Sequence, residues 1–166
     1  MAQNSSSEKK LAVSAVNFMW INDQFCTAGQ PSFEDLKNLK KKGLKGVLNL
    51  KIPGESTILE QEKQHAETLR LKYFNIPVDS SNLQNTQVDQ FLSIVKDTTN
   101  RPLLIHCQSA NRVGAFWMIY RVVIDQWARE KAEKEAHKIG LRSPILAQFA
   151  YQYIKSYRNN RSKKSF

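Results

Sequence analysis

Short apolar runs alternate with amphipathic segments through most of this 166-residue chain. Three of the runs, 44–50, 72–78 and 102–106, have the length and composition of strands buried in a parallel sheet. Parallel neighbours need a crossover connection, usually a helix, and the intervening segments have helical periodicity. The sequence therefore predicts an α/β domain: a compact, mostly parallel sheet of about four or five strands, flanked by helices on both faces.

The first part of the chain predicts two strands and a helix. Residues 16–29 fit two short strands around a turn at Asn22-Asp23. Ser32 has the position of a helix N-cap, with Asp35 three residues later, and Gly43 marks a helix end at about Lys42.

Further helices are predicted between and after the later strands. Thr86 and Asp89 have the spacing of a capping box, and the helix that they open carries its apolar side chains on one face (Val88, Phe91, Leu92 and Val95). The remaining helices are expected at about 57–70, from near Arg112, at about 128–139 with Gly140 as its end, and at about 144–158.

The chain shows no internal repeat and no linker that would divide it. We therefore expect a single domain at residues 13–158. Residues 1–12 are polar and are predicted to be disordered, and residues 159–166 are predicted to form a basic C-terminal tail.

Composition limits the class of protein. No apolar run approaches the length of a membrane span, and two cysteines are too few for a disulfide framework. We expect a cytoplasmic protein, although an exported precursor trimmed of its leader would leave the same pattern. The net charge of +10 favours anionic partners, but solvated ends and helix faces account for much of it. The sequence has no nucleic-acid motif and no His/Cys cluster with metal-ligand spacing, so we expect neither nucleic acid nor a metal or other cofactor.

One stretch carries reactive side chains, HCQSANRVG at 106–114. It lies between a predicted strand and a predicted helix, so Cys107 is expected at the carboxyl end of a parallel strand, where ligands bind in open α/β sheets. The backbone N–H groups of the next residues and the helix N-terminus would stabilise a thiolate there. Arg112 can hold two oxygens of a tetrahedral anion. This pattern predicts attack by the Cys107 thiolate on phosphorus.

The segment PLLIHC, with the arginine and the apolar helix that follow, resembles the cysteine-dependent protein tyrosine phosphatases, especially the dual-specificity type. The stretches 27–50, 76–78 and 106–117 are similar to a narrower bacterial group, the phosphatase-like domain found in beta-lactamase-hydrolase-like proteins. The resemblance implies a small phosphatase that works through a cysteinyl-phosphate. Its expected substrates are a phosphorylated peptide or a small phosphomonoester. The sequence gives no oligomeric state.

The resemblance also implies roles for residues around the loop. The phosphate-binding segment would be Gln108, Ser109, Ala110, Asn111 and Arg112. Asp79 stands where the related enzymes carry the acid that protonates the leaving oxygen, with Asp89 as the second choice. Supporting residues would be His106, Val113, Gly114 and Lys51, the last following a strand at the same edge of the sheet.

Three departures keep other functions open. Only four residues separate Cys107 from Arg112, whereas dual-specificity phosphatases have five. Val113 stands where a hydroxyl residue commonly helps the thiolate leave, and Ala110 stands where glycine is common and φ is positive. The four-residue spacing is shared with rhodanese sulfurtransferases, and a non-catalytic phosphate-binding module is the third alternative.

Cys26 could in principle pair with an oxidised Cys107, but packing in a strand accounts for it as well.

Overall fold

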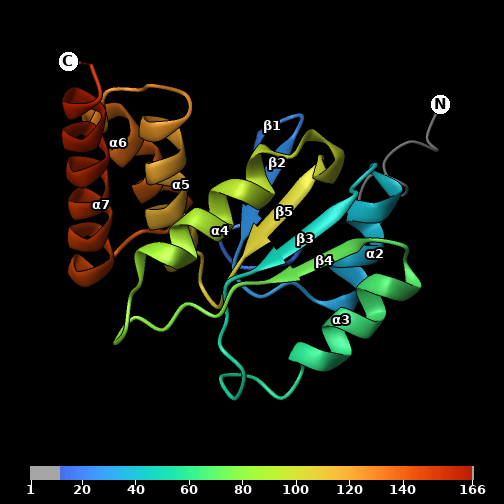
Figure 1. Ribbon diagram of the computed structural model, residues 1–166. Coiled ribbons are helices and arrows are strands. Elements are labelled where there is room, and N and C mark those ends of the chain that lie inside the picture. The colour runs from blue at the N-terminus through green and yellow to red at the C-terminus, as the bar shows by residue number, and fades with distance from the viewer. Residues whose placement is uncertain (1–11, 166) are drawn as a thin grey trace.

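The computed structural model describes residues 12–165 and contains one five-stranded sheet in the order β1-β2-β5-β3-β4 (Figure 1). The antiparallel pair β1 (Met19–Asn22) and β2 (Phe25–Ala28) occupies one side. The central strand β5 (Leu103–His106) lies parallel between β2 and β3 (Gly46–Asn49), and β4 (Lys72–Asn75) forms the other edge. The predicted mostly parallel sheet is therefore confirmed.

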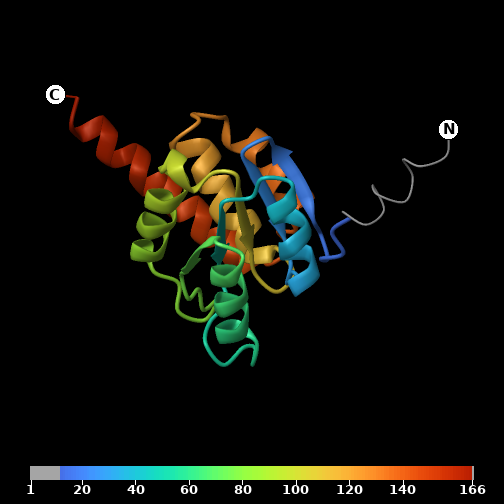
Figure 2. The ribbon, with the colours of Figure 1, turned by 90° about the vertical axis from the view of Figure 1, so that its right-hand side faces the viewer.

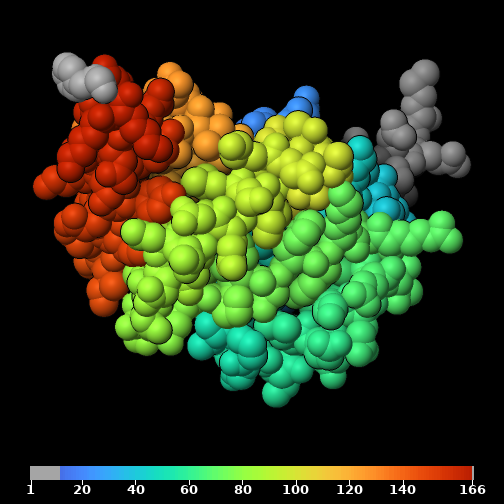
Figure 3. Space-filling view, in the orientation of Figure 1, coloured from blue at the N-terminus to red at the C-terminus, as the bar shows by residue number. Residues whose placement is uncertain are grey.

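Helices cover both faces of this sheet (Figures 1 and 2). On one face lie α2 (Phe33–Lys41) and α3 (Leu59–Thr68), and on the other lie α4 (Asn85–Lys96) and α5 (Asn111–Val123). The last two helices, α6 (Arg129–Ile139) and α7 (Pro144–Lys163), pack against α5. In the space-filling view α4 lies across the front of the molecule, with α7 at its left (Figure 3).

Side-chain alternation along the strands divides the core into two parts. Leu103 and Ile105 of β5 pack with α4, α5 and α7, whereas Leu104 packs with α2 and α3. Both parts are fully enclosed, which explains why these strands read as continuous apolar runs in the sequence. Within residues 12–165, no helix combines the length and the apolar character needed to cross a membrane.

The sheet register brings three strand ends together. Ala28, Asn49 and His106 lie side by side as the last residues of β2, β3 and β5. Residues that follow these strands, among them Gln30, Lys51 and Cys107, therefore meet at one edge of the sheet. This edge is the expected position for a ligand site in an open α/β fold.

Several element boundaries differ from the sequence-based prediction. The capping box of α4 is formed by Gln84 and Gln87, not by Thr86 and Asp89, because the helix begins two residues earlier than that pattern requires. Helix α7 continues to Lys163, so most of the predicted basic tail is helical, with basic side chains in the last turn where the helix dipole favours them. Strand β4 ends at Asn75, short of the predicted 78. The disorder predicted for residues 1–12 falls almost entirely outside the described residues.

The capping box predicted for α2 is present, and it can be tested. The Ser32 hydroxyl accepts the N–H of Asp35 at 3.0 Å, and the Asp35 carboxylate accepts the N–H of Ser32 at 2.9 Å. We expect Ser32→Ala to lower the free energy of unfolding by about 1 kcal/mol, measured by urea denaturation. Thr86→Ala is the matched control and should change it little, because Thr86 is not the cap of α4. An equal loss in both variants would contradict this assignment.

Candidate active site

Cys107 lies directly after the central strand β5, and its side chain is buried. The loop that follows runs into α5, whose N-cap Ala110 has φ 67° and ψ 10°. This is the left-handed conformation that was expected at this position, held here by a residue with a Cβ. The turn points the N-terminus of α5 back at the end of β5, so the positive end of the helix dipole faces the loop.

Two carbonyl groups of this loop accept hydrogen bonds from residues outside the loop. The backbone N–H of Gln30 donates to the Gln108 carbonyl at 3.1 Å, and the side-chain amide of Asn17 donates to the Ser109 carbonyl at 2.9 Å. By contrast, the N–H groups of residues 108–110 have no protein acceptor within the described part of the chain. These amide donors are therefore available to an anion, as at other loops that lead into a helix N-terminus.

Two glycines allow α6 and the segment after it to back this loop closely. A Cβ on Gly114 of α5 would lie 2.8 Å from the Ala136 carbonyl, and one on Gly140 would lie 3.0 Å from the Ser109 carbonyl. Gly140 also has φ 150°, which a residue with a side chain rarely adopts. Gly114, predicted to support the loop, therefore has a packing role in this structure.

The side chain of Asn111 is engaged on the far side of the loop. Its Oδ1 accepts the backbone N–H groups of Arg142 and Ser143, at 3.0 and 3.1 Å, where α7 begins. Asn111 was predicted as a phosphate ligand, but the amide side chain is directed to α7. The Oδ1 atom is thus occupied, and the side-chain Nδ2 and the backbone N–H of Asn111 remain as donors.

Arg112, in the first turn of α5, is fixed by two partners. Its Nη1 and Nη2 donate to the two carboxylate oxygens of Glu55, the first at 2.8 Å, and Nη1 also donates to the Val78 carbonyl at 3.1 Å. These contacts use both N–H groups of Nη1 and one N–H of Nη2. The Nε–H and the other Nη2–H point in the same direction and are left to bind a second partner with two oxygens.

The ion pair shifts the pKa values of both partners. The hydrogen bond from Arg112 holds the pKa of Glu55 below its ordinary range. Burial works against the charge of Arg112, but the bond to Glu55 and the charge of a nearby Cys107 outweigh it and raise the pKa of the guanidinium. Arg112 is therefore a permanent cation close to the Cys107 sulfur.

Asp79 lies next to this arginine, but its carboxylate is turned to its own loop. Oδ1 accepts the Ser81 hydroxyl at 2.7 Å and the Ser81 N–H at 2.8 Å, and these bonds lower the pKa of Asp79. In this conformation Asp79 is an ionised cap of the loop. To protonate a leaving group it would have to release Ser81 and take up a proton.

His106 and Lys51 lie on the other side of β5, and both are fully buried. His106 pairs through Nε2 with the carboxylate of Glu62 at 3.0 Å, and the Lys51 ammonium donates to Gln30 Oε1 at 2.9 Å. Lys51 thus lies at the predicted edge of the sheet, bonded to a neutral side chain. Val113 is also fully buried and supplies no hydroxyl to the loop.

A cavity of about 440 Å³ opens beside the loop. It brings together Arg112, Asp79 and Ser109 with Glu55, and Leu146 of α7 also lines it. Asp89, the second choice for the acid, is not among the lining residues. It lies on α4 and accepts the Tyr153 hydroxyl at 2.8 Å.

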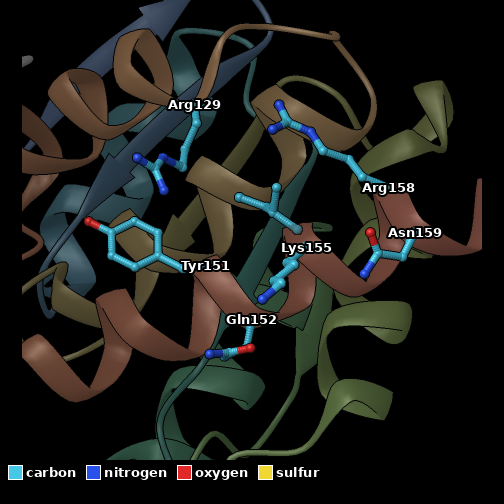
Figure 4. Close-up of a pocket in the computed structure, with 7 residues that line it drawn as sticks. Arg129, Tyr151, Gln152, Lys155, Arg158 and Asn159 are labelled. Atoms are coloured by element: carbon cyan, nitrogen blue, oxygen red, sulfur yellow. The ribbon is translucent and has the colours of Figure 1, made fainter.

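A separate pocket of about 260 Å³ lies between α6 and α7 (Figure 4). Its lining residues are basic, amide, aromatic or aliphatic: Arg129, Tyr151, Gln152, Ile154, Lys155, Arg158 and Asn159. It contains neither a thiol nor a carboxylate, so it lacks the groups that phosphoryl transfer from the loop would use. No group of three potential metal ligands occurs among residues 12–165.

Cys26 packs in the part of the core that contains α2 and α3, whereas Cys107 belongs to the part that contains α5. Both cysteines are unpaired thiols, and burial raises the pKa of Cys26. Cys26 is therefore a packing residue in this structure.

The sequence analysis missed two acidic residues, Glu55 and Glu62. Glu55 lies in an irregular loop after Pro53-Gly54, where no periodicity applies. Glu62 is buried on a short helix of weak amphipathic character, so nothing distinguishes it from the exposed acids around it. The signal that could have found Glu62 is spatial: His106 is buried at the end of a strand and requires a polar partner.

Comparison with known proteins identifies the family. The model of a DSP-PTPase phosphatase fused to NAD+ kinase matches residues 14–152. The chain belongs to this family, which confirms the resemblance to protein tyrosine and dual-specificity phosphatases.

Individual relatives agree with this assignment. The beta-lactamase hydrolase-like protein of Xylella fastidiosa is 24% identical over 123 residues, which are 72% of this chain and 28% of that protein. The chain thus spans well under a third of the length of this relative. The catalytic core of the PP-IP phosphatase Siw14 from Saccharomyces cerevisiae has a TM-score of 0.74 at 21% identity, covering 93% of this chain and 96% of that one. TpbA of P. aeruginosa, solved with pTyr, has a TM-score of 0.65 at 18% identity, with 86% and 87% covered.

The geometry of Arg112 leads to a prediction. Arg112→Lys keeps the positive charge but loses the planar group that can hold Glu55 and an oxyanion at once. We expect inorganic phosphate to protect Cys107 from iodoacetamide in the parent protein and to give at least tenfold less protection in the variant, measured from the phosphate concentration that halves the alkylation rate. The control is Lys45→Arg, which exchanges the same two residue types just before β3, at the opposite end of the strand from the loop. Equal protection in Arg112→Lys and the parent would exclude the bidentate role.

Proposed function

We propose that this protein is a cysteine-based phosphatase that hydrolyses phosphomonoesters through a cysteinyl-phosphate intermediate. The observation that carries the proposal is the loop after β5. There a buried thiol lies near the Arg112 guanidinium, and the N–H groups of residues 108–110 have no protein acceptor among the described residues. A phosphoryl group with three equatorial oxygens matches this set of donors.

In the first step Asp79 has released Ser81 and taken up a proton from solvent. The Cys107 thiolate attacks phosphorus, the phosphorus–oxygen bond to the leaving group breaks, and the leaving oxygen takes that proton from Asp79. In the second step a water molecule attacks phosphorus, and the sulfur leaves as a thiolate. The proton of the water returns to Asp79, so the enzyme is restored. Because Val113 provides no hydroxyl to the departing sulfur, we expect the second step to be slow.

The lining of the cavity supports a class of substrate. Two carboxylates, of Glu55 and Asp79, accompany the single guanidinium group of Arg112, and the loop itself contains no lysine. Such a site accommodates one phosphate but repels further phosphates on the same molecule. A phosphopeptide or a small monophosphate with a neutral or basic remainder therefore fits better than a polyphosphate.

Asp79→Asn tests the acid. We expect the variant to hydrolyse phenyl phosphate roughly 10²–10⁴-fold more slowly, because phenolate is a poor leaving group without a proton. Hydrolysis of a nitrophenyl ester should change much less, since nitrophenolate leaves readily. The measurement is kcat/KM for both esters, with Asp89→Asn as the control. Equal effects on the two esters would remove Asp79 from the mechanism.

The two alternative functions can be told apart by measuring phosphate release from esters and sulfur transfer from thiosulfate. A sulfurtransferase would move sulfur from thiosulfate to cyanide through Cys107, release sulfite and need no carboxylic acid. A non-catalytic module would protect Cys107 with phosphate yet release no phosphate from any ester. Either result would overturn the proposed function.

A further inference from the structure

Glu62 is a buried carboxylate that the proposed reaction does not use directly. Its side chain is 1% exposed, yet four side chains donate to it. Oε1 accepts the Gln30 amide at 2.7 Å. Oε2 accepts the Tyr73 hydroxyl at 2.7 Å, the Asn49 amide at 3.1 Å and His106 Nε2 at 3.0 Å. Burial alone would raise the pKa of Glu62, but the charge of His106 and these bonds together hold it below its ordinary range.

His106 is placed between two acceptors. Its Nε2 faces the Glu62 carboxylate, and its Nδ1 faces the Cys107 carbonyl at 3.3 Å. A carbonyl oxygen can only accept, and a neutral imidazole has a single N–H to donate. His106 is fully buried, so solvent does not offer another partner. Because the lowered pKa of Glu62 keeps its carboxylate ionised, both contacts can be hydrogen bonds only if both ring nitrogens carry protons.

The bond to the Cys107 carbonyl bears on the loop. In a planar trans peptide the C=O of Cys107 and the N–H of Gln108 point in opposite directions. Since His106 draws the carbonyl toward α3, the Gln108 N–H points to the opposite face, toward α5. The Gln108 N–H has no protein acceptor among the described residues, so it is available to an anion on that side.

The charged groups around this pair are consistent with a doubly protonated ring. Tyr73, from β4, is a neutral donor, because burial and the Glu62 charge raise its pKa. Lys51, His106 and Arg112 are then positive, and Glu55, Glu62 and Asp79 are negative, so the charges of these six side chains balance.

We propose that Glu62 is a positioning residue for Cys107: by keeping both nitrogens of His106 protonated, it anchors the first peptide of the loop in its anion-binding orientation. The role in turnover rests on the proposed function. The effect on the thiol does not, so the two can be tested separately.

The test compares Glu62→Gln with Asp35→Asn. Asp35 is a matched control, because it is another buried carboxylate that accepts several hydrogen bonds, but it caps α2 away from the loop. We expect Glu62→Gln to slow the alkylation of Cys107 by iodoacetamide at pH 6–7 on the order of tenfold, with the rate recovering at high pH. Asp35→Asn should lower the melting temperature and leave the pH profile of alkylation unchanged.

A second measurement uses the parent protein alone, so it does not depend on whether Glu62→Gln folds. In ¹⁵N-labelled protein at pH 7.5, where a free histidine is mostly neutral, both ring nitrogens of His106 should carry protons by NMR. A single protonated nitrogen would overturn the proposal. So would a folded Glu62→Gln whose alkylation profile matches the parent. If no phosphate ester is hydrolysed but the alkylation difference is found, the proposed function fails and the role of Glu62 stands.

Discussion

The position of β5 determines the rest of the site. As the central strand it has parallel neighbours on both sides, so the segments that leave β2 and β3 flank the segment that leaves β5. Gln30 binds a loop carbonyl from one side, and Lys51 binds the side chain of Gln30 from the other. A strand at the edge of the sheet could not have received support from two directions. The loop can therefore direct its amides inward, because other parts of the chain satisfy its carbonyls.

Charge is distributed differently on the two sides of that strand end. On the solvent side Arg112 is held by Glu55, and the free part of its guanidinium group is available for an anion. On the buried side His106 and Glu62 form a pair that no solvent reaches. Removing one member of a fully buried pair leaves an uncompensated charge and is costly. The His106–Glu62 pair is thus suited to a fixed structural task, whereas the Arg112–Glu55 pair, at 12% and 23% exposure, is partly open to solvent.

The sequence was sufficient for those parts of the structure that depend on periodicity and on local capping. The alternation of strands and helices and the capping box at Ser32 were predicted, because each depends on a few neighbouring residues. The resemblance to phosphatase loops pointed to a strained or remodelled backbone at Ala110, and the structure keeps the left-handed conformation there. The capping box of α4 was assigned to the wrong pair, since glutamine side chains performed a task usually given to serine or threonine. Glu55 and Glu62 could not be found, because their partners are 57 and 44 residues away in the chain.

The bond between Asn111 and the start of α7 has a mechanical consequence. Helix α7 has 20 residues and so is about 30 Å long, and the backbone N–H groups of the two residues just before it are bonded to the residue that follows the left-handed turn. A contact made near Lys163 therefore acts on the same rigid helix whose other end is bonded to Asn111. The loop between β5 and α5 is thereby connected to a surface well away from the sheet.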